Sequence, residues 1–329
     1  MSTPKRQHII PCLHLRHFAG DDPSGQVWNY DAQSGRVWPA APENTAVEGH
    51  FYSGERDDGS MDTTIEEHLA SVENSAVPVY TALLRGEIPD ESQERADFAH
   101  FIGLMFSRTR AMRRMAADGY GKFMQIMLYA YASHPEAFDT AIRRYEEETG
   151  QQLSPEQREH ARQSMIDPSK YEFVVPRERT LTALSTADKL APLFYNMKWW
   201  VMTAANSYFI TSDNPVVREV DPRSVSPFYG DGGFANRTVE VTFPLSPQKL
   251  LLMTWSEAEY RKEIDGEAVW AANMARASHS EQFLYAHCND AEVTKLAAEF
   301  RDSRPGMRIS GFGPKNFGNV RLRRRRERD

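Results

Sequence analysis

The sequence has little cysteine and no long apolar run. Two cysteines among 329 residues, Cys12 and Cys288, exclude a disulfide-rich scaffold. No stretch approaches the roughly 20 apolar residues that a membrane-spanning helix needs. The first residues are basic but lack the apolar segment of a secretory leader. We therefore expect a cytoplasmic protein that does not associate with membranes.

The familiar catalytic signatures are missing as well. The sequence has no Walker loop, no Gly-x-Gly-x-x-Gly after a strand, no His-Glu-x-x-His and no Gly-x-Ser-x-Gly. A zinc site at Cys12, His14 and His17 would need a second pair of ligands, and Cys288 stands alone beside His287. Any activity must therefore be argued from single residues rather than from a signature motif.

The net charge of −7 hides an uneven distribution. Residues 301–329 carry ten basic and three acidic side chains, so this end has a charge of +7 and the first 300 residues have −14. We expect residues 304–329 to form a flexible tail that binds nucleic acid phosphates or folds back on the acidic body. The run that would contact nucleic acid is Arg321, Arg323, Arg324, Arg325 and Arg326.

Sequence periodicity predicts strands at both ends of the chain and helices between them. Residues 26–31 and 36–38 flank Ser34-Gly35 and predict a β-hairpin. Helical spacing begins near Asp62, continues through 94–117, 120–133 and 135–148, and resumes after the Ser154 capping box and at 178–195. The apolar composition of 120–133 predicts deep burial. Short strands and two further helices follow from Trp199 onward.

These elements predict an α+β fold in which the N-terminal hairpin joins a C-terminal mixed or antiparallel sheet. A large helical insertion, about 62–197, would separate the two parts of that sheet. We expect one domain over 1–303, and the alternative is a division into two domains near Pro176.

Four residues in the first third of the chain are candidates for catalysis or binding. His8 precedes the apolar Ile-Ile-Pro segment and fits either an acid–base group or a hydrogen-bonded structural histidine. Glu66 and Glu73 lie two helical turns apart, where they would bind a divalent cation or form ordinary helix surface. Arg108 aligns with the apolar stripe of its helix, so it needs a carboxylate or an anionic ligand.

The segment Phe209-Ile210-Thr211-Ser212-Asp213-Asn214-Pro215 predicts a buried strand that ends in a turn. Polar residues at the end of a strand are common in active sites. Asp213 could bind a metal, act as a base or orient His8, whereas in an Asx-turn it would only accept backbone N–H bonds.

Several motifs together resemble a bacterial family of unknown function. In order they are HIIPCLHLRHFA, VWNYD, FYSGE, TIEEHLASVE, FIGLMFSRTR, KWWVMTAANSYFITSDNPV and FPLSPQKLLLM. The resemblance covers most of residues 7–288, and Thr-Ser-Asp-Asn-Pro is its most specific piece. It implies that certain positions recur without implying an activity. These positions are His8, Pro11, Arg16, Glu66, Glu73, Arg108, Asp213, Asn214, Pro215, Ser246 and Asn273.

Two hypotheses of function follow. If the recurring polar residues converge on an open cleft, they suit a metal-dependent hydrolase of phosphodiesters or nucleic acids. Its catalytic residues would be His8, Asp213 and Glu73, its substrate-binding residues Arg108, Arg16 and Asn214, and its metal ligands Glu66, Glu73 and Asp213. If they are buried and hydrogen-bonded to one another, they form a structural network in a non-catalytic binding or regulatory protein.

Overall fold

The computed structural model describes residues 6–20, 25–49, 51–52, 64–167, 173, 175, 181–226 and 230–303. Contacts divide the chain into two compact units. The main unit comprises Met1–Arg114 with Arg177–Pro305, and the helical unit comprises Met115–Pro176 with Gly306–Asp329. The expected single domain over 1–303 stays a prediction, and the expected Arg-rich tail lies outside the described residues.

The predicted α+β class is confirmed, and so is the joining of the N-terminal hairpin to the C-terminal part of the chain. Strands β2 (Val27–Asp31) and β3 (Val37–Ala40) form the hairpin. Gly35 adopts a φ of 71° in its turn, a conformation that glycine takes without strain. Strand β11 (Phe283–Ala286) pairs antiparallel with β2 on one side and with β6 (Thr211–Ser212) on the other.

A second, five-stranded sheet has the order β10-β5-β9-β8-β7. Its long strands are β5 (Lys198–Ala204), β8 (Glu240–Ser246) and β9 (Lys249–Thr254), paired antiparallel. Strand β7 (Val217–Glu219) pairs with β8, and β10 (Glu263–Ile264) runs parallel to β5. A separate two-stranded sheet joins β1 (Arg6–His8) to β4 (Val47–Gly49).

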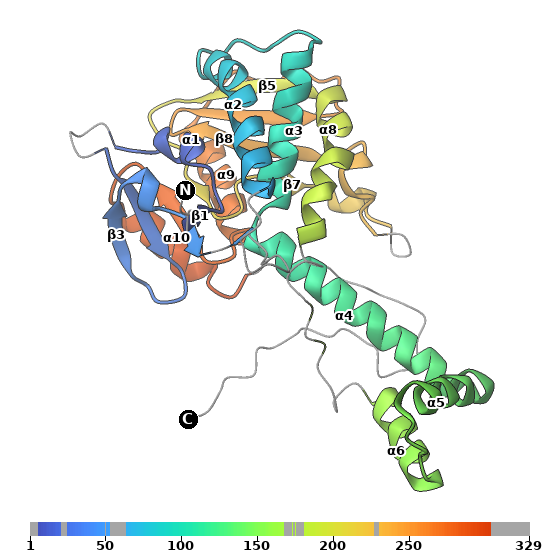
Figure 1. Ribbon diagram of the computed structural model, residues 1–329. Helices are drawn as coiled ribbons and strands as arrows, with labels where there is room; N and C mark the ends of the chain where they lie inside the picture. Colours follow the sequence, from blue (N-terminus) through green and yellow to red (C-terminus); the bar gives the residue numbers. More distant parts are fainter. Residues whose placement is uncertain are drawn as a thin grey trace. The chain divides into compact units, whose positions relative to one another are not determined.

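Three helices pack together on the five-stranded sheet to form the core of the main unit. Helix α3 (Gln93–Ser107) contacts both α2 (Thr64–Leu84) and α8 (Thr186–Asn196), and α2 also contacts β8. Figure 1 shows these helices side by side across the strands. Alternate residues of β9, such as Leu251 and Met253, join the helices in this core because successive side chains of a strand point to opposite faces.

Three further helices lie in the described part of the main unit. They are α1 (Cys12–Arg16), α9 (Gly266–Ser278) and α10 (Ala291–Glu299), with single-turn segments at Pro42–Asn44, Thr182–Ser185, Pro222–Ser224 and Gly233–Ala235. Val269 of α9 packs against Phe209 and Leu250. Leu250 lies on the face of β9 that points away from the helical core. Helix α9 is thereby held against the segment that contains the Thr-Ser-Asp-Asn-Pro motif.

The helical unit contains most of α4 (Arg110–Ser133), together with α5 (Pro135–Thr149) and α6 (Pro155–Ile166). The predicted capping box at the start of α6 is confirmed, because Ser154 and Gln157 exchange side-chain and backbone hydrogen bonds. Glu146 of α5 binds Arg158 of α6 at 2.9 Å, which fixes the two helices to each other.

Two expectations for the helices were wrong. The predicted helix over 94–117 is broken after Ser107, because the Thr109 hydroxyl accepts the N–H of Met112 and caps the start of α4. The predicted deep burial of 120–133 is also wrong, because Ala132 is the one buried residue of this stretch. Among the described residues, no helix is both long and apolar enough to cross a bilayer.

Candidate functional site

The carboxylate of Asp213, at the centre of the Thr-Ser-Asp-Asn-Pro motif, is buried, and both of its oxygens accept backbone N–H groups. Its Oδ1 accepts the N–H of Glu281 at 2.9 Å. Its Oδ2 accepts the N–H groups of Gln282 at 2.8 Å and Phe283 at 3.0 Å. Asp213 therefore fixes the turn that leads from α9 into β11.

The environment of Asp213 also changes its proton affinity. Burial raises the pKa of Asp213 to about 6, although the three N–H donors and the charge of Arg110 act in the opposite direction. A carboxyl group with a pKa near neutrality suits acid–base chemistry. Both oxygens, however, accept N–H groups of the protein itself. These donors lie 68 to 70 residues later in the chain, so the contact is structural without being the local Asx-turn that the sequence left as the alternative.

Neighbouring amide side chains continue this pattern along α9. The Nδ2 of Asn214 donates to the carbonyl of His279 at 2.9 Å. Asn273 of α9 accepts the N–H of Ile210 and donates to the carbonyl of Tyr208. We call the group Asp213, Asn214, Asn273 and Arg276 the polar seam, because each of these side chains binds backbone across the junction between 208–215 and α9–β11.

Arg276, the fourth member of the polar seam, lies about one helical turn after Asn273 on α9. Its guanidinium donates to the carbonyl of Pro215 at 2.5 Å and to the hydroxyl of Thr242 at 3.2 Å. Burial lowers the pKa of Arg276 to about 9, and the charge of Glu219 only partly offsets this. Within the described ranges no carboxylate forms an ion pair with this guanidinium, so carbonyl oxygens stabilise its charge.

His14 lies beside the motif and has a defined proton arrangement. Its Nδ1 is 2.9 Å from the Tyr80 hydroxyl, which donates its only proton to the carbonyl of Leu245. Nδ1 must therefore donate to Tyr80, and Nε2 then accepts from the hydroxyl of Thr211 at 2.9 Å. Burial lowers the pKa of His14 well below its usual value, so the ring is neutral. With both nitrogens bonded, it cannot serve the zinc site considered for Cys12, His14 and His17.

Arg108 forms a second buried cluster, at the junction between α3 and α4. Its Nη1 donates to Glu73 at 2.6 Å, Nη2 to the backbone carbonyl of His8 at 2.6 Å, and Nε to the Tyr52 hydroxyl at 3.1 Å. Burial disfavours the charged guanidinium, yet Tyr52 and Glu73 raise the pKa of Arg108 above its usual value. The side chain of Glu73 is 25% exposed, so this cluster reaches the surface.

The predicted site residues are thus distributed over several places. Glu73, Arg108 and the backbone of His8 meet, whereas Asp213 and Asn214 belong to the polar seam. Arg16 pairs with exposed Glu43 at 2.9 Å. Glu66, Glu73 and Asp213 do not form a metal-binding group, and within the described part of the chain no three His, Cys, Asp or Glu side chains do.

Sequence reasoning did not single out Arg276, His14 or Tyr80 as parts of these networks. Asn273 and Arg276 are three residues apart on α9, a spacing that places two side chains on the same helix face. That spacing was a usable signal for Arg276. The partners of His14 and Tyr80 lie far away in the chain, and local spacing carries no signal for them.

A groove of about 510 Å³ opens between α3 and α8. Its lining includes Ser92, Gln93 and Tyr195, and it contains His100, whose Nε2 lies 3.1 Å from a carboxylate oxygen of Asp188. Asp188 is largely exposed, and none of the site residues predicted from the sequence lines the groove. The groove is a separate concavity, away from both buried clusters.

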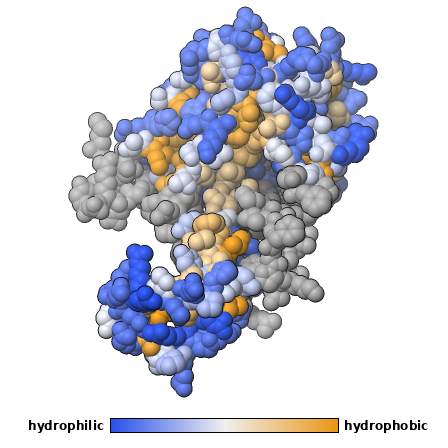
Figure 2. Space-filling view, turned by 90° about the vertical axis from the view of Figure 1, so that its right-hand side faces the viewer, coloured by the Kyte–Doolittle hydropathy of each residue, from blue (hydrophilic) through white to orange (hydrophobic). Residues whose placement is uncertain are grey.

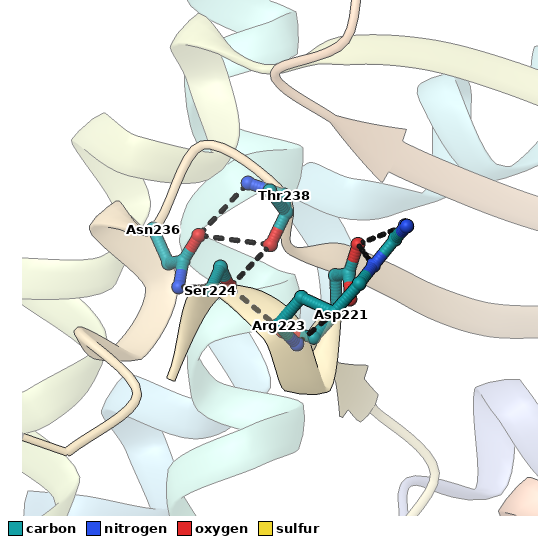
Figure 3. Close-up of polar contacts among 5 residues, drawn as sticks. All are labelled: Asp221, Arg223, Ser224, Asn236 and Thr238. Atoms are coloured by element: carbon teal, nitrogen blue, oxygen red, sulfur yellow. Dashed lines mark hydrogen bonds and ion pairs between the residues drawn. The ribbon is translucent and has the colours of Figure 1, made fainter. Parts of the chain in front are cut away.

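The polar loop between β7 and β8 is closed by its own hydrogen bonds (Figure 3). Arg223 binds the carboxylate of Asp221, and the Ser224 hydroxyl lies 2.8 Å from that of Thr238. Asn236 accepts the N–H of Thr238 at 2.9 Å and donates to Ser224 at 3.0 Å. These contacts between neighbouring turns explain the polar composition of the loop.

Comparison with known proteins gives a family. No curated protein and no solved structure matches the chain. One family model covers residues 6–290, which include His8, Arg108, the Thr-Ser-Asp-Asn-Pro motif and Asn273. The chain therefore belongs to the family described as protein of unknown function (DUF4238).

Proposed function

We propose that the chain is a non-catalytic binding or regulatory protein whose recurring polar residues hold its fold together. The observation that carries this proposal is the carboxylate of Asp213. Three backbone N–H groups occupy its two oxygens, and the residue is buried. A carboxylate has about four lone pairs, so one on Oδ1 remains, but burial keeps it from the substrate or metal that a catalytic carboxylate must reach.

The other recurring polar residues support the same interpretation. Asn273 uses both ends of its amide group and Asn214 its Nδ2 on backbone atoms, and Arg108 binds Glu73, Tyr52 and the His8 carbonyl. Buried polar groups that satisfy one another specify one arrangement of helices and strands. This role accounts for the polar residues of the motifs without requiring a reaction.

The test measures both the melting temperature and the hydrolysis of phosphodiesters for the wild type and two variants. The full chain is incubated with Mg²⁺ or Mn²⁺ and either bis(4-nitrophenyl) phosphate or single- and double-stranded DNA, beside Asp213→Asn and Glu73→Gln. We expect both variants to melt at lower temperature and no substrate to be hydrolysed faster by the wild type than by the variants. Hydrolysis that is lost in a variant with an unchanged melting temperature would contradict the proposal.

A hydrolase acting on phosphodiesters is the second candidate, and the adjacency of Glu73, Arg108 and His8 favours it. Arg108 would hold an anion and Glu73, which is partly exposed, would act as a base. Replacing Glu73 by Gln keeps the size of the side chain but removes its basicity. The same assay therefore decides between the candidates, since only the hydrolase requires Glu73→Gln to abolish turnover.

Nucleic acid binding through Arg321, Arg323, Arg324, Arg325 and Arg326 remains part of this second candidate. Each phosphate neutralised by an arginine releases counterions, so such binding weakens steeply with salt. Fluorescence anisotropy of labelled DNA with the full chain and with a chain ending at residue 303 tests it. Equal affinity and equal salt dependence of the two chains would rule the tail out as the binding segment.

A further inference from the structure

Helix α4 carries an apolar face that reaches solvent in the helical unit. Large side chains on it are well exposed: Tyr120 by 37%, Phe123 by 57%, Ile126 by 45% and Tyr131 by 45%. Figure 2 shows hydrophobic colour at the surface of the helical unit, next to hydrophilic side chains. An exposed group of large apolar side chains is informative, because single scattered ones are normal on a protein surface.

These exposed residues lie on one side of the helix. With 3.6 residues per turn, they fall within an arc of roughly 140°. We call this arc the α4 apolar face; it comprises Tyr120, Phe123, Ile126, Met127, Ala130 and Tyr131. The charged residues of the same stretch, Asp118 and Lys122, point to the other side of the helix.

This arrangement is the reverse of a surface helix. Such a helix buries its apolar side and exposes its charged side. Here the apolar face contains no charged residue over three turns, and all its members except the half-buried Met127 are exposed. The helical unit on its own therefore leaves this apolar face without a cover among the residues that the structure describes.

We propose that the α4 apolar face is the interface of a homodimer, so that the same face of a second copy covers it. A two-fold symmetric interface must be complementary to itself, which a charge-free face satisfies without any repulsion between like charges. Homodimer interfaces are also more apolar than those of transient complexes. A partner attracted by charge would find nothing on this face to steer it.

The dimensions agree with a helix pair. From Tyr120 to Tyr131 the helix extends roughly 18 Å. The three aromatic side chains expose roughly 300 Å², given about 200 Å² for each aromatic ring and the exposed fractions above. A standard interface buries about 800 Å² on each partner, so these rings supply more than a third of it. Tyrosine is also among the residues that most often dominate binding energy.

This inference extends the proposed binding function by naming a partner, but it does not depend on the absence of catalysis. Its test is the mass of the full chain in solution, measured by sedimentation equilibrium over a wide range of concentration. Phe123→Glu places a charge at the middle of the α4 apolar face, and Tyr131→Glu does so at its end. Val77→Glu is the matched control, because Val77 is 40% exposed on α2 of the main unit.

We expect a dimer for the wild type and for Val77→Glu, and a dissociation constant raised at least about tenfold in both α4 variants. Circular dichroism verifies that each variant keeps its helix content. If Phe123→Glu loses helix, Tyr131→Glu decides the outcome. A wild-type chain that is monomeric at every concentration, or a folded α4 variant that dimerises like the wild type, would overturn the proposal. A monomer would leave the structural role of Asp213 untouched.

Discussion

The polar seam of the main unit and the α4 apolar face of the helical unit depart from the usual distribution of side chains in opposite directions. In the polar seam, a carboxylate, two amides and a guanidinium are buried. On α4, aromatic and aliphatic side chains are exposed. Each departure costs free energy unless a partner compensates it.

The two regions differ in where that partner is. In the polar seam the partners belong to the same chain and are mostly backbone groups, although the Oδ1 of Asn214 and the Nε of Arg276 have no hydrogen-bond partner among the described residues. On α4 no described residue of the helical unit covers the apolar face, and in the proposed homodimer a second copy would cover it. The comparison teaches that the buried polar residues here serve the architecture, whereas the exposed apolar face is the region proposed for interaction.

The largest effect is expected from Asp213→Ala in the polar seam. Three backbone N–H groups would lose their acceptor inside the protein, and an unmet buried donor costs about 1–3 kcal/mol. Relief of the buried charge offsets part of this, so we expect the free energy of unfolding to fall by about 3 kcal/mol. Urea unfolding measures it, with Asp221→Ala in the exposed β7–β8 loop as the control. Equal losses in the two variants would contradict the structural role of Asp213.

The next effect is expected from Glu73→Ala. This change leaves the buried Arg108 without its carboxylate, and breaking a fully buried pair costs about 3–5 kcal/mol. Because the Glu73 side chain is 25% exposed, we expect about 2 kcal/mol. Glu43→Ala removes the exposed partner of Arg16 and should cost below about 1 kcal/mol. A Glu73→Ala chain as stable as Glu43→Ala would show that solvent replaces the carboxylate.

An effect no larger than this is expected from His14 on the pH dependence of the free energy of unfolding. Its pKa is lowered well below 6.5 in the folded state, so the unfolded chain binds the proton more readily. Stability from this group is therefore complete above pH 6.5 and is lost as the pH falls below it, by up to about 2 kcal/mol at pH 5. In His14→Gln this loss is absent, and the stability difference from the wild type should narrow toward pH 5. A difference that does not change with pH would mean that His14 binds its proton as readily in the folded chain as in the unfolded chain, which would contradict the lowered pKa.

The smallest effect is expected from Phe123→Glu on the stability of the single chain. The side chain is exposed, and changes at such positions stay within about 0.5 kcal/mol. Thermal unfolding at a protein concentration below the dissociation constant of the dimer tests this. A large loss there would place Phe123 in a core of its own chain and would remove the contrast between the two regions.

The sequence predicted much of the fold because its local signals were strong. The hairpin around Gly35, the capping box of Ser154 and the strand that follows Asn196 all depend on neighbours within a few residues. The break between α3 and α4 was missed because apolar spacing continues through it, and only the Thr109 hydroxyl marks the new start.

The candidate site was harder to predict, for a physical reason. Asp213 meets its three donors about 70 residues later in the chain, and Tyr80 meets Leu245 across 165 residues. Local patterns identify a polar residue but not the group that will face it. In the same way, the composition of 120–133 reveals an apolar helix without revealing whether the cover comes from its own chain.

The most direct test of the structural role of Asp213 is hydrogen exchange at the three backbone amides whose N–H groups its carboxylate accepts. In the wild type, the amides of Glu281, Gln282 and Phe283 should be protected, although two of them precede the strand β11. In Asp213→Ala they should exchange at least about tenfold faster, while amides in β9 keep their relative order of protection. Amides that are equally protected with and without the carboxylate would contradict the account.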